Sequence, residues 1–517
     1  MRRAERKAVV SIRSEPHFGD RTVRCYMPRP GSLQALVDGA LARAPDGEAL
    51  VDGAQRWRWQ ALVDDAARLA GGLQARGLQA GDRVLLLLGN RAAFVLASLA
   101  LARLGAVAVP LSVRSAPPEV DYVAGHCGAV LALVEDTLVG HLPAELAHVP
   151  VSALGAVQGP APAAAVVDEE DTAVILYTSG TTGRPKGAML SHLNIVHSVM
   201  HYAACMALTA QDRSLVAVPL SHVTGLVAQL WALVHAAGTL VLLDGFKAGD
   251  FLRLAEAERT THTLMVPAMY QLCLLQEDVA RFDLRHWRIG GYGGAPMAPA
   301  TIAALAERLP ALTLMNAYGA TETASPATIM PMGQTAAHPD SVGVAVPCGE
   351  LCIVDAAGQP LPAGESGEIW IRGPMVVRGY WNNPEATAAA LSDGWWHSGD
   401  VGRLDAAGYL QVLDRIKDVI NRGGYKVFCS EVEAVLAQHP AVAESAVVGY
   451  ACPVLGERVH AFVSLRDGAE TDPDTLRRWC AARLADYKLP ERWTLQTTLL
   501  PRNANGKLMK RTLRDQA

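Results

Sequence analysis

The sequence predicts an α/β protein with a large N-terminal domain and a small α+β domain behind it. Between residues 33 and 316, short apolar runs alternate with Ala/Leu-rich helical patterns, which is the β-α-β rhythm of parallel sheets. From about 340 to 412 the pattern changes to short strands separated by glycine turns, which indicates a small β-barrel or meander. A chain of 517 residues is long enough for at least two such domains.

The first β-α-β unit follows directly from the residues. Val84–Leu88 is predicted as a buried strand, Ala92–Leu104 as a helix that ends near Gly105, and Val107–Leu111 as the next strand. The same rhythm returns around residues 174–200, 214–243 and 262–316, without a repeat of fixed period.

One apolar stretch, residues 223–243, is hydrophobic enough to resemble a membrane span. Gly225, Gln229, His235 and Gly238 interrupt it. A buried helix followed by a strand is therefore the better interpretation, and no stable membrane insertion is expected.

The second domain is predicted to begin near Asp414, which divides the chain into residues 1–413 and 414–517. After this point come a Gly-Gly turn, a helix from Ser430, two strands, a further helix and a basic tail. Ser430 is followed three residues later by Glu433, which predicts a capping box. Because no low-complexity linker joins the domains, any motion between them must turn on one or two residues at the junction.

Composition and charge exclude several classes of protein. The net charge of −5 gives no reason to expect nucleic-acid binding. No apolar core follows the basic residues near the N-terminus, so a targeting peptide is not expected. The nine cysteines are scattered without a Cys-x-x-Cys pair, which predicts reduced thiols in the cytoplasm and no zinc site. The oligomeric state stays open, with a homodimer as one possibility.

The strongest functional signal is Tyr-Thr-Ser-Gly-Thr-Thr-Gly-Arg-Pro-Lys-Gly at residues 177–187. Glycines allow backbone N–H groups to face an anion, hydroxyls donate further hydrogen bonds, and Lys186 adds positive charge. The spacing differs from a Walker P-loop, and Pro185 next to the lysine lacks an amide N–H. The segment therefore predicts a phosphate-binding loop of another kind.

Four further motifs contain residue types suited to a nucleotide. Residues 290–296 form a glycine-rich turn after a predicted strand. Residues 316–324, Asn-Ala-Tyr-Gly-Ala-Thr-Glu-Thr-Ala, offer an aromatic ring, a hydroxyl and a carboxylate that can bind a hard cation. Residues 397–400 place an aspartate after a glycine, and Gly506-Lys507 follows a Pro-Arg turn near the end of the sequence. Residues 422–426 contain two consecutive glycines, which would allow a ligand to pass close to the backbone but are equally compatible with a tight turn.

Together these motifs resemble the adenylate-forming (AMP-binding) superfamily, in its acyl-CoA synthetase or acid–thiol ligase branch, from about residue 35 to 510. The resemblance implies two α/β layered subdomains plus a small β-barrel, followed by a small mobile α+β C-terminal domain that carries the catalytic lysine. It also implies ATP and Mg²⁺ as cofactors and CoA as a co-substrate.

The resemblance assigns roles to residues of this chain. The catalytic residues would be Lys507, His222 and Thr321, with Asp414 as the hinge and Thr178 and Glu322 at the metal. CoA would pass Gly423, Gly424 and Lys426, and the acyl pocket would include His222, Val223, Gly225, Tyr292 and Ala320. ATP and AMP would bind to Thr178, Ser179, Gly180, Thr181, Thr182, Gly183, Lys186, Gly293, Gly294, Ala295, Pro296, Tyr318, Gly319, Thr321, Asp400, Arg415 and Lys507.

The expected reaction is the ATP-dependent conversion of a fatty or aromatic carboxylic acid to its CoA thioester through an acyl-adenylate. Lys507 would serve adenylation, and rotation at Asp414 would then bring Gly423-Gly424 to the site. Val223 stands where related peptide synthetases carry an aspartate for the substrate ammonium, so α-amino acids are expected to be excluded. The alternative is a stand-alone ligase that loads an acyl group onto a carrier protein.

Overall fold

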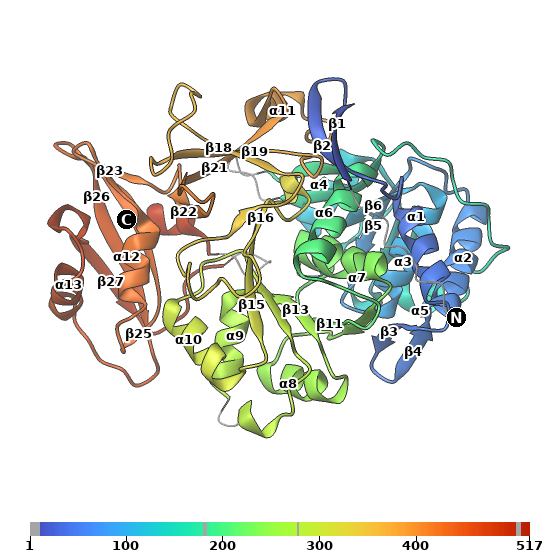
Figure 1. Ribbon diagram of the computed structural model, residues 1–517, viewed down its shortest axis with the longest axis horizontal. Coiled ribbons are helices and arrows are strands. Elements are labelled where there is room, and N and C mark those ends of the chain that lie inside the picture. Colours follow the sequence, from blue (N-terminus) through green and yellow to red (C-terminus); the bar gives the residue numbers. More distant parts are fainter. Residues whose placement is uncertain (1–10, 179–183, 277–278, 503–507) are drawn as a thin grey trace. The chain divides into compact units, whose positions relative to one another are not determined.

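The chain folds into two compact units. The computed structural model describes residues 11–178, 184–276, 279–502 and 508–517 (Figure 1). Because the segment from 352 to 410 alternates between the units, no single cut in the sequence separates them. The domain junction at Asp414 stays a prediction. The first unit contains Met1–Leu351, Trp370–His397 and Gly408–Leu410, and the second contains Cys352–Ile369, Ser398–Ala407 and Gln411–Ala517.

The first unit contains a six-stranded sheet in the order β10-β9-β6-β5-β7-β8. All neighbours are parallel except β10, which runs antiparallel to β9 at the edge. The predicted β-α-β unit is confirmed, and Gly105 ends α3 in the left-handed conformation with φ of 66°. The elements are β5 (Arg83–Leu87), α3 (Ala92–Leu104), β6 (Val107–Pro110), α4 (Pro117–Cys127), β7 (Ala129–Val134), η1 (Asp136–His141), β8 (His148–Pro150), α5 (Val151–Leu154), β9 (Thr172–Thr178) and β10 (Lys186–Ser191).

The same unit contains a nine-stranded sheet in the order β17-β16-β15-β14-β13-β11-β12-β3-β4. Its central strands from β15 to β3 are parallel. Phe251, Tyr270 and Trp287 are completely buried in the core that packs against these strands. The strands are β3 (Glu48–Asp52), β4 (Gln55–Arg58), β11 (Arg213–Val216), β12 (Thr239–Leu242), β13 (His262–Met265), β14 (Ile289–Tyr292), β15 (Thr313–Tyr318), β16 (Thr328–Ile329) and β17 (Val344–Ala345).

Helices complete this unit around the two sheets (Figure 1). Ser191 caps α6, because its side chain accepts from the Asn194 amide while the Asn194 side chain accepts from the Ser191 amide. The helices are α1 (Leu33–Arg43), α2 (Trp59–Ala75), α6 (His192–Cys205), α7 (Ala232–Ala236), α8 (Ala248–Ala257), α9 (Pro267–Leu274), η3 (Val279–Arg281), α10 (Pro299–Arg308), η4 (Thr321–Thr323) and α11 (Pro384–Ala390).

The apolar stretch at 223–243 forms a buried helix and a strand, as predicted. Its first part is a π-helix, η2 (Thr224–Trp231), which continues into α7 and then β12. Gly225 packs against the preceding turn so closely that a Cβ atom there would lie 2.3 Å from the Pro219 carbonyl oxygen. The glycine is therefore required by the way this helix begins.

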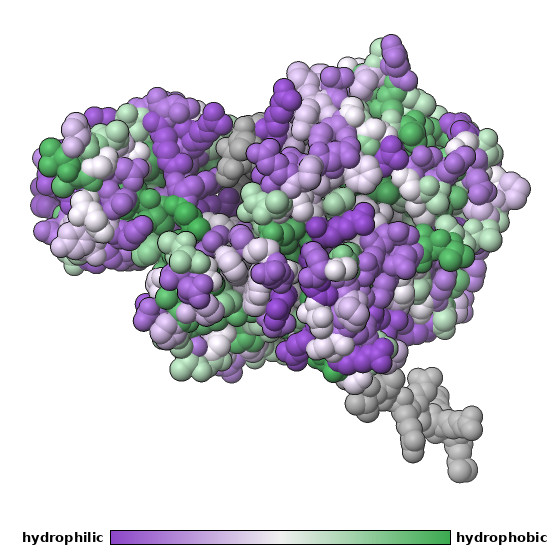
Figure 2. Space-filling view, turned by 90° about the horizontal axis from the view of Figure 1, so that it is seen from above, coloured by the Kyte–Doolittle hydropathy of each residue, from purple (hydrophilic) through white to green (hydrophobic). Residues whose placement is uncertain are grey.

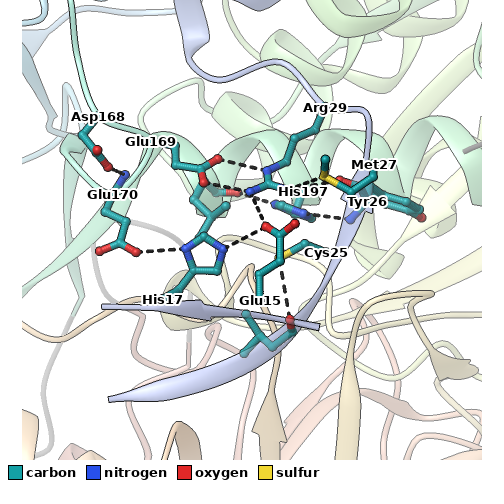
Figure 3. Close-up of polar contacts among 12 residues, drawn as sticks. Glu15, His17, Cys25, Tyr26, Met27, Arg29, Asp168, Glu169, Glu170 and His197 are labelled. Atoms are coloured by element: carbon teal, nitrogen blue, oxygen red, sulfur yellow. Dashed lines mark hydrogen bonds and ion pairs between the residues drawn. The ribbon is translucent and has the colours of Figure 1, made fainter. Parts of the chain in front are cut away.

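An N-terminal hairpin of β1 (Ser11–His17) and β2 (Arg21–Met27) is fastened to the first unit by charged side chains (Figure 3). Arg29 bridges Glu15 and Glu169 at 2.7 and 2.8 Å. His17 lies between Glu170, at 2.9 Å, and Glu15. Arg29 lowers the pKa of Glu15 to about 2, chiefly through its hydrogen bond. Arg29 supplies the positive charge that these carboxylates need. The ion pairs therefore attach the hairpin to residues 169 and 170.

The second unit has its own core and a sheet in the order β24-β23-β26-β25, with β27 beside β26. The predicted capping box at Ser430 and Glu433 is wrong. The helix α12 begins at Cys429, its N-cap Phe428 makes no side-chain capping bond, and Glu433 instead accepts from the Val447 amide. The elements are β23 (Ile420–Arg422), β24 (Tyr425–Val427), α12 (Cys429–Leu436), β25 (Val442–Cys452), β26 (Gly456–Leu465), α13 (Pro473–Ala481), η5 (Asp486–Lys488), β27 (Arg492–Gln496) and α14 (Lys510–Arg514).

Short strands separated by glycine turns occupy residues 350–415, as the sequence predicts. They are β18 (Glu350–Val354), β19 (Gly367–Arg372), β20 (Leu391–Ser392), β21 (Trp395–Leu404) and β22 (Leu410–Arg415). Several of these strands carry residues of both compact units.

The surface and the cysteines agree with the composition. The face in Figure 2 is largely hydrophilic, with hydrophobic residues in small groups. No helix in the described part of the chain has the length and apolar character needed to cross a membrane. All nine cysteines are free thiols, and seven of them are buried.

Candidate active site

Three loops of the first unit leave the carboxyl ends of parallel strands of the nine-stranded sheet. Residues 217–222 follow β11, residues 293–296 follow β14, and residues 319–320 follow β15. Tyr292, which ends β14, pairs with Asn316 of the adjacent strand β15, and β15 ends two residues later at Tyr318. The carboxyl ends of parallel strands are where α/β proteins bind ligands.

Backbone contact at this edge explains one of the predicted glycines. A Cβ on Gly293 would lie 2.3 Å from the Ala317 carbonyl oxygen, which no side chain tolerates. Gly294 has φ of +77°, and a Cβ there would be in ordinary contact with Val266 at 3.8 Å. Residues 294–296 therefore form an exposed bend directly after the end of β14.

The base of the predicted phosphate loop is a strand pair. Thr178 ends β9 and Lys186 begins β10, and the two residues are register partners. The Lys186 ammonium lies 5.3 Å from the ring centroid of Tyr380, within cation–π range. Five predicted nucleotide residues, Ser179, Gly180, Thr181, Thr182 and Gly183, lie outside the described residues, as does the predicted catalytic Lys507.

Glu322 sits on a short 3-10 turn, η4, that follows Tyr318. Its side chain is buried, with 9% exposure, and its Oε1 accepts a hydrogen bond from the Tyr380 hydroxyl at 2.8 Å. The Val377 amide donates to the Glu322 carbonyl oxygen at 2.9 Å. Since η4 also contacts β10, Glu322 lies near the strand that Lys186 begins. The fold thus brings together a carboxylate and a lysine that are far apart in sequence.

The residues after η4 hold a strained backbone. Ala324 and Ser325 have φ of 47° and 50°, a region that costs non-glycine residues about 1–2 kcal/mol each. Helix α6 secures this turn, because Ser198 donates to the Ser325 carbonyl at 2.8 Å and Tyr202 bonds the Ser325 hydroxyl at 2.7 Å. Such strain is typical of functional sites.

A carboxylate in this position fits Mg²⁺. Magnesium is usually held by one or two carboxylates together with substrate phosphates, so a dedicated cluster of ligands is not needed. Glu322 would supply a buried, oriented oxygen ligand, and Thr178 would add a hydroxyl from the base of the predicted phosphate loop. Thr321, which the resemblance assigns to catalysis and to ATP binding, is the first residue of the same turn.

Asp400 and Arg415, two of the residues that the resemblance assigns to ATP and AMP, lie together in the second unit. Arg415 Nε is 3.3 Å from Asp400 Oδ1, and the Ile416 amide donates to the Gly399 carbonyl at 2.9 Å. The Asp400 amide donates to the Ser398 hydroxyl at 3.0 Å. This arrangement holds a carboxylate next to a guanidinium, a pairing suited to sugar hydroxyls.

Asp414, the predicted hinge, also serves the start of helix α12. Its Oδ1 accepts from the Arg415 amide at 2.8 Å and its Oδ2 from the Ser430 amide at 3.2 Å. The carboxylate is largely buried, and this burial raises its pKa above the usual value. Sequence reasoning missed this capping contact because the two partners are 16 residues apart.

Gly423 and Gly424, which CoA is predicted to pass, form the two-residue turn of a β-hairpin. Gly423 and Gly424 have φ of 59° and 91°, and Arg422 pairs with Tyr425 across the turn. Positive φ at both positions is the reason for glycine here. Lys426 lies on β24 opposite Asn421. The role of these residues toward CoA stays a prediction.

The predicted acyl-pocket residues have different surroundings. His222 shares a hydrogen bond with the Thr224 hydroxyl at 3.2 Å, and Val223 is buried at the start of η2. Tyr292 is buried in the core of the nine-stranded sheet. Ala320 is the N-cap of η4, and the small size of Gly225 is explained by its contact with Pro219. Their common role as a pocket stays a prediction.

Two family models match this chain. The model described as AMP-binding enzyme covers residues 37–381, and the model described as AMP-binding enzyme C-terminal domain covers residues 431–507. The first includes Glu322 and Tyr380, and the second ends at Lys507.

Similar proteins match almost the whole length. A feruloyl-CoA synthase from Amycolatopsis sp is 36% identical over 475 residues, with 91% of this chain and 96% of that protein covered. A 2-succinylbenzoate–CoA ligase from Geobacillus kaustophilus is 35% identical, with 91% and 95% covered. The solved o-succinylbenzoate CoA synthetase (MenE) of Bacillus subtilis, in complex with its acyl-adenylate, superimposes with a TM-score of 0.86 at 30% identity, with 93% and 98% covered.

Proposed function

The chain belongs to the AMP-binding enzyme family, and we propose that it acts there as an aryl-CoA ligase for an aromatic monocarboxylic acid. It is an ATP-dependent acid–thiol ligase, which makes an acyl-adenylate and then a CoA thioester and releases AMP and pyrophosphate. The observation that carries the choice of acid is the full-length similarity to a feruloyl-CoA synthase.

In the first step, a carboxylate oxygen of the acid attacks the α-phosphorus of ATP, and the bond to pyrophosphate breaks. The loops after β14 and β15 would hold the adenine beside Tyr318, and Lys186 would meet the phosphates. Asp400 and Arg415 would hold the ribose. Magnesium, when bound at Glu322, neutralises negative charge on the departing pyrophosphate. Lys507 would bridge the substrate carboxylate and the α-phosphate.

In the second step, the CoA thiol attacks the acyl carbon, and AMP leaves with the electron pair of the broken bond. Lys507 has no function in this step. We propose that rotation at Asp414 removes it and presents the hairpin at Gly423-Gly424 to the pantetheine arm. Two reactions with different geometry at one adenylate account for a separate C-terminal domain.

The preference for a single carboxylate rests on the residues of the predicted pocket. The segments 219–226, 291–297 and 316–326 contain neither arginine nor lysine. A second carboxylate, such as the name 2-succinylbenzoate implies, would need a cationic partner when it is buried. Val223 likewise offers no charge to an α-ammonium group.

The location of the protein, its independence of nucleic acid and its oligomeric state are also proposals. Reduced, mostly buried thiols support a cytoplasmic location, and the net charge of −5 supports action without nucleic acid. A homodimer is the first oligomeric state to test, by light scattering of the full-length protein.

The test is a screen of carboxylic acids by pyrophosphate release, with cinnamic-type acids beside fatty acids, 2-succinylbenzoate and α-amino acids. We expect acid-dependent pyrophosphate release with a cinnamic-type acid, followed by loss of free CoA thiol. Release only with fatty acids or dicarboxylates would refute the proposed acid. Adenylation without thiol loss would instead indicate transfer to a carrier protein.

A further inference from the structure

We propose that Tyr380 is a positioning residue for the metal-binding carboxylate. Its hydroxyl holds Glu322 in the orientation in which that carboxylate meets the metal–ATP complex. The inference rests on the proposed function for the identity of the ligand, and on the contacts of Tyr380 for everything else.

The contact itself is short and shielded from solvent. The Tyr380 hydroxyl donates to Glu322 Oε1 at 2.8 Å, and the two residues are 7% and 9% exposed. A tyrosine hydroxyl carries its proton at neutral pH and an ionised carboxylate can only accept, so Tyr380 is the donor. A charge-assisted bond of this kind restricts rotation of the carboxylate about its last torsion.

The backbone around Tyr380 is fixed on one side by the strand that follows the phosphate loop. Tyr380 forms an antiparallel bridge with Ala188 of β10. On either side of it, the Trp381 amide donates to the Gly187 carbonyl at 2.7 Å, and the Met189 amide donates to the Gly379 carbonyl at 3.1 Å. Residues 379–381 therefore extend the edge of the six-stranded sheet.

The same segment is tied on its other side to the turn that carries Glu322. The Val377 amide donates to the Glu322 carbonyl, and the Thr387 hydroxyl accepts from the Tyr380 amide at 2.9 Å. The ring of Tyr380 also faces the Lys186 ammonium. One side chain thus contacts the lysine at the base of the phosphate loop and the carboxylate of the metal site.

The consequence is a specific effect on metal-dependent binding. Hydrogen-bond partners behind a metal ligand typically contribute about 10- to 100-fold to metal affinity. ATP without a metal ion does not need an oriented carboxylate. Loss of the Tyr380 hydroxyl should therefore weaken the binding of metal–ATP and leave the binding of free ATP nearly unchanged.

The test uses the full-length protein and measures binding without turnover. Calorimetry gives the Kd of ATP with Mn²⁺ and with EDTA, and paramagnetic resonance of free Mn²⁺ gives the affinity for the metal. For Tyr380→Phe we expect at least a tenfold loss of affinity with Mn²⁺ and a change below twofold in EDTA. Tyr26→Phe is the matched control, because its buried hydroxyl has no hydrogen-bond partner among the described residues.

Two further variants show whether the effect passes through Glu322. In a Glu322→Gln background, Tyr380→Phe should cause no additional loss, and an equal loss in both backgrounds would overturn the proposal. Thr387→Val loosens the Tyr380 amide without changing the ring and should shift the Mn²⁺ value in the same direction. If thermal melting shows that Tyr380→Phe does not fold, Thr387→Val decides.

Wild-type Kd values in both metal conditions would overturn the role of Tyr380. Failure of the proposed function looks different, because the wild-type protein would then show no acid-dependent pyrophosphate release. The binding comparison does not depend on that result.

Discussion

Replacement of Asp414 tests its part in capping helix α12. The carboxylate accepts from the Arg415 and Ser430 amides, and it is 9% exposed. Asp414→Ala removes both acceptors, whereas Asp414→Asn keeps one carbonyl oxygen. The first turn of α12 should therefore lose protection in the order wild type, asparagine variant, alanine variant.

The size of the loss follows from the two bonds. At about 0.5–1.5 kcal/mol for each bond, Asp414→Ala should destabilise the start of α12 by roughly 1–3 kcal/mol, and Asp414→Asn by about half as much. A loss of about 1–3 kcal/mol corresponds to roughly 5- to 150-fold faster opening.

The pH dependence has a defined sign. Burial raises the pKa of Asp414 in the folded protein above its ordinary value of 3.8. The folded state then binds more protons than the unfolded state, so the stability from this group falls as pH rises upward from 3.8. The difference between wild type and either variant should therefore be larger at pH values near 4 than at neutral pH.

Hydrogen exchange read by mass spectrometry on peptides that cover residues 414–436 measures this directly. Each variant is compared with wild type at both pH values, which cancels the intrinsic effect of pH on exchange. Exchange of Asp414→Ala within twofold of wild type would refute the capping contact. A larger loss at neutral pH than at acidic pH would refute the assigned direction of the pKa.

Three other predictions concern the strained turn and the two half-reactions. Ala324→Gly should be about 1–2 kcal/mol more stable in urea unfolding than Ala327→Gly, because both alanines are completely buried but only Ala324 has a positive φ; equal midpoints would contradict the strain. Lys507→Ala should abolish adenylation yet retain thioesterification of supplied acyl-AMP, and equal loss of both would count against two states. Gly424→Leu should impair thioesterification more than Gly408→Leu. Gly408 also has a positive φ and open space around it, so its variant controls for backbone strain. Equal thioesterification rates in the two variants would contradict the predicted passage of CoA at Gly424.

Local signals predicted most elements of the first unit. The helix that starts after Ser191 and the one that ends at Gly105 have the expected limits, because their caps are made by residues within a few positions. The loops at residues 293–296 and 319–320 could also be placed at strand ends, since an apolar strand precedes each of them.

Tertiary contacts decided the features that the sequence did not reveal. Ser430 and Glu433 have the spacing of a capping box. The Ser430 amide instead donates to the distant Asp414 carboxylate, and the Glu433 carboxylate accepts from the Val447 amide. Tyr380 meets Glu322 across 58 residues, and a lone tyrosine has no spacing that indicates such a contact. No sequence spacing indicates the contacts of Ser325 either, because its strained backbone is held by Ser198 and Tyr202 of α6.

The π-helix that begins at Thr224 has one more residue per turn than an α-helix would need. Because a π turn accommodates one extra residue, deletion of one residue from it would let that turn close as ordinary α-helix and leave the side chains beyond it facing the same way, whereas deletion from a regular α-helix rotates them by about 100°. Relatives of this chain could thus gain or lose one residue in this segment without turning α7 away from the core, while Gly225 stays against Pro219.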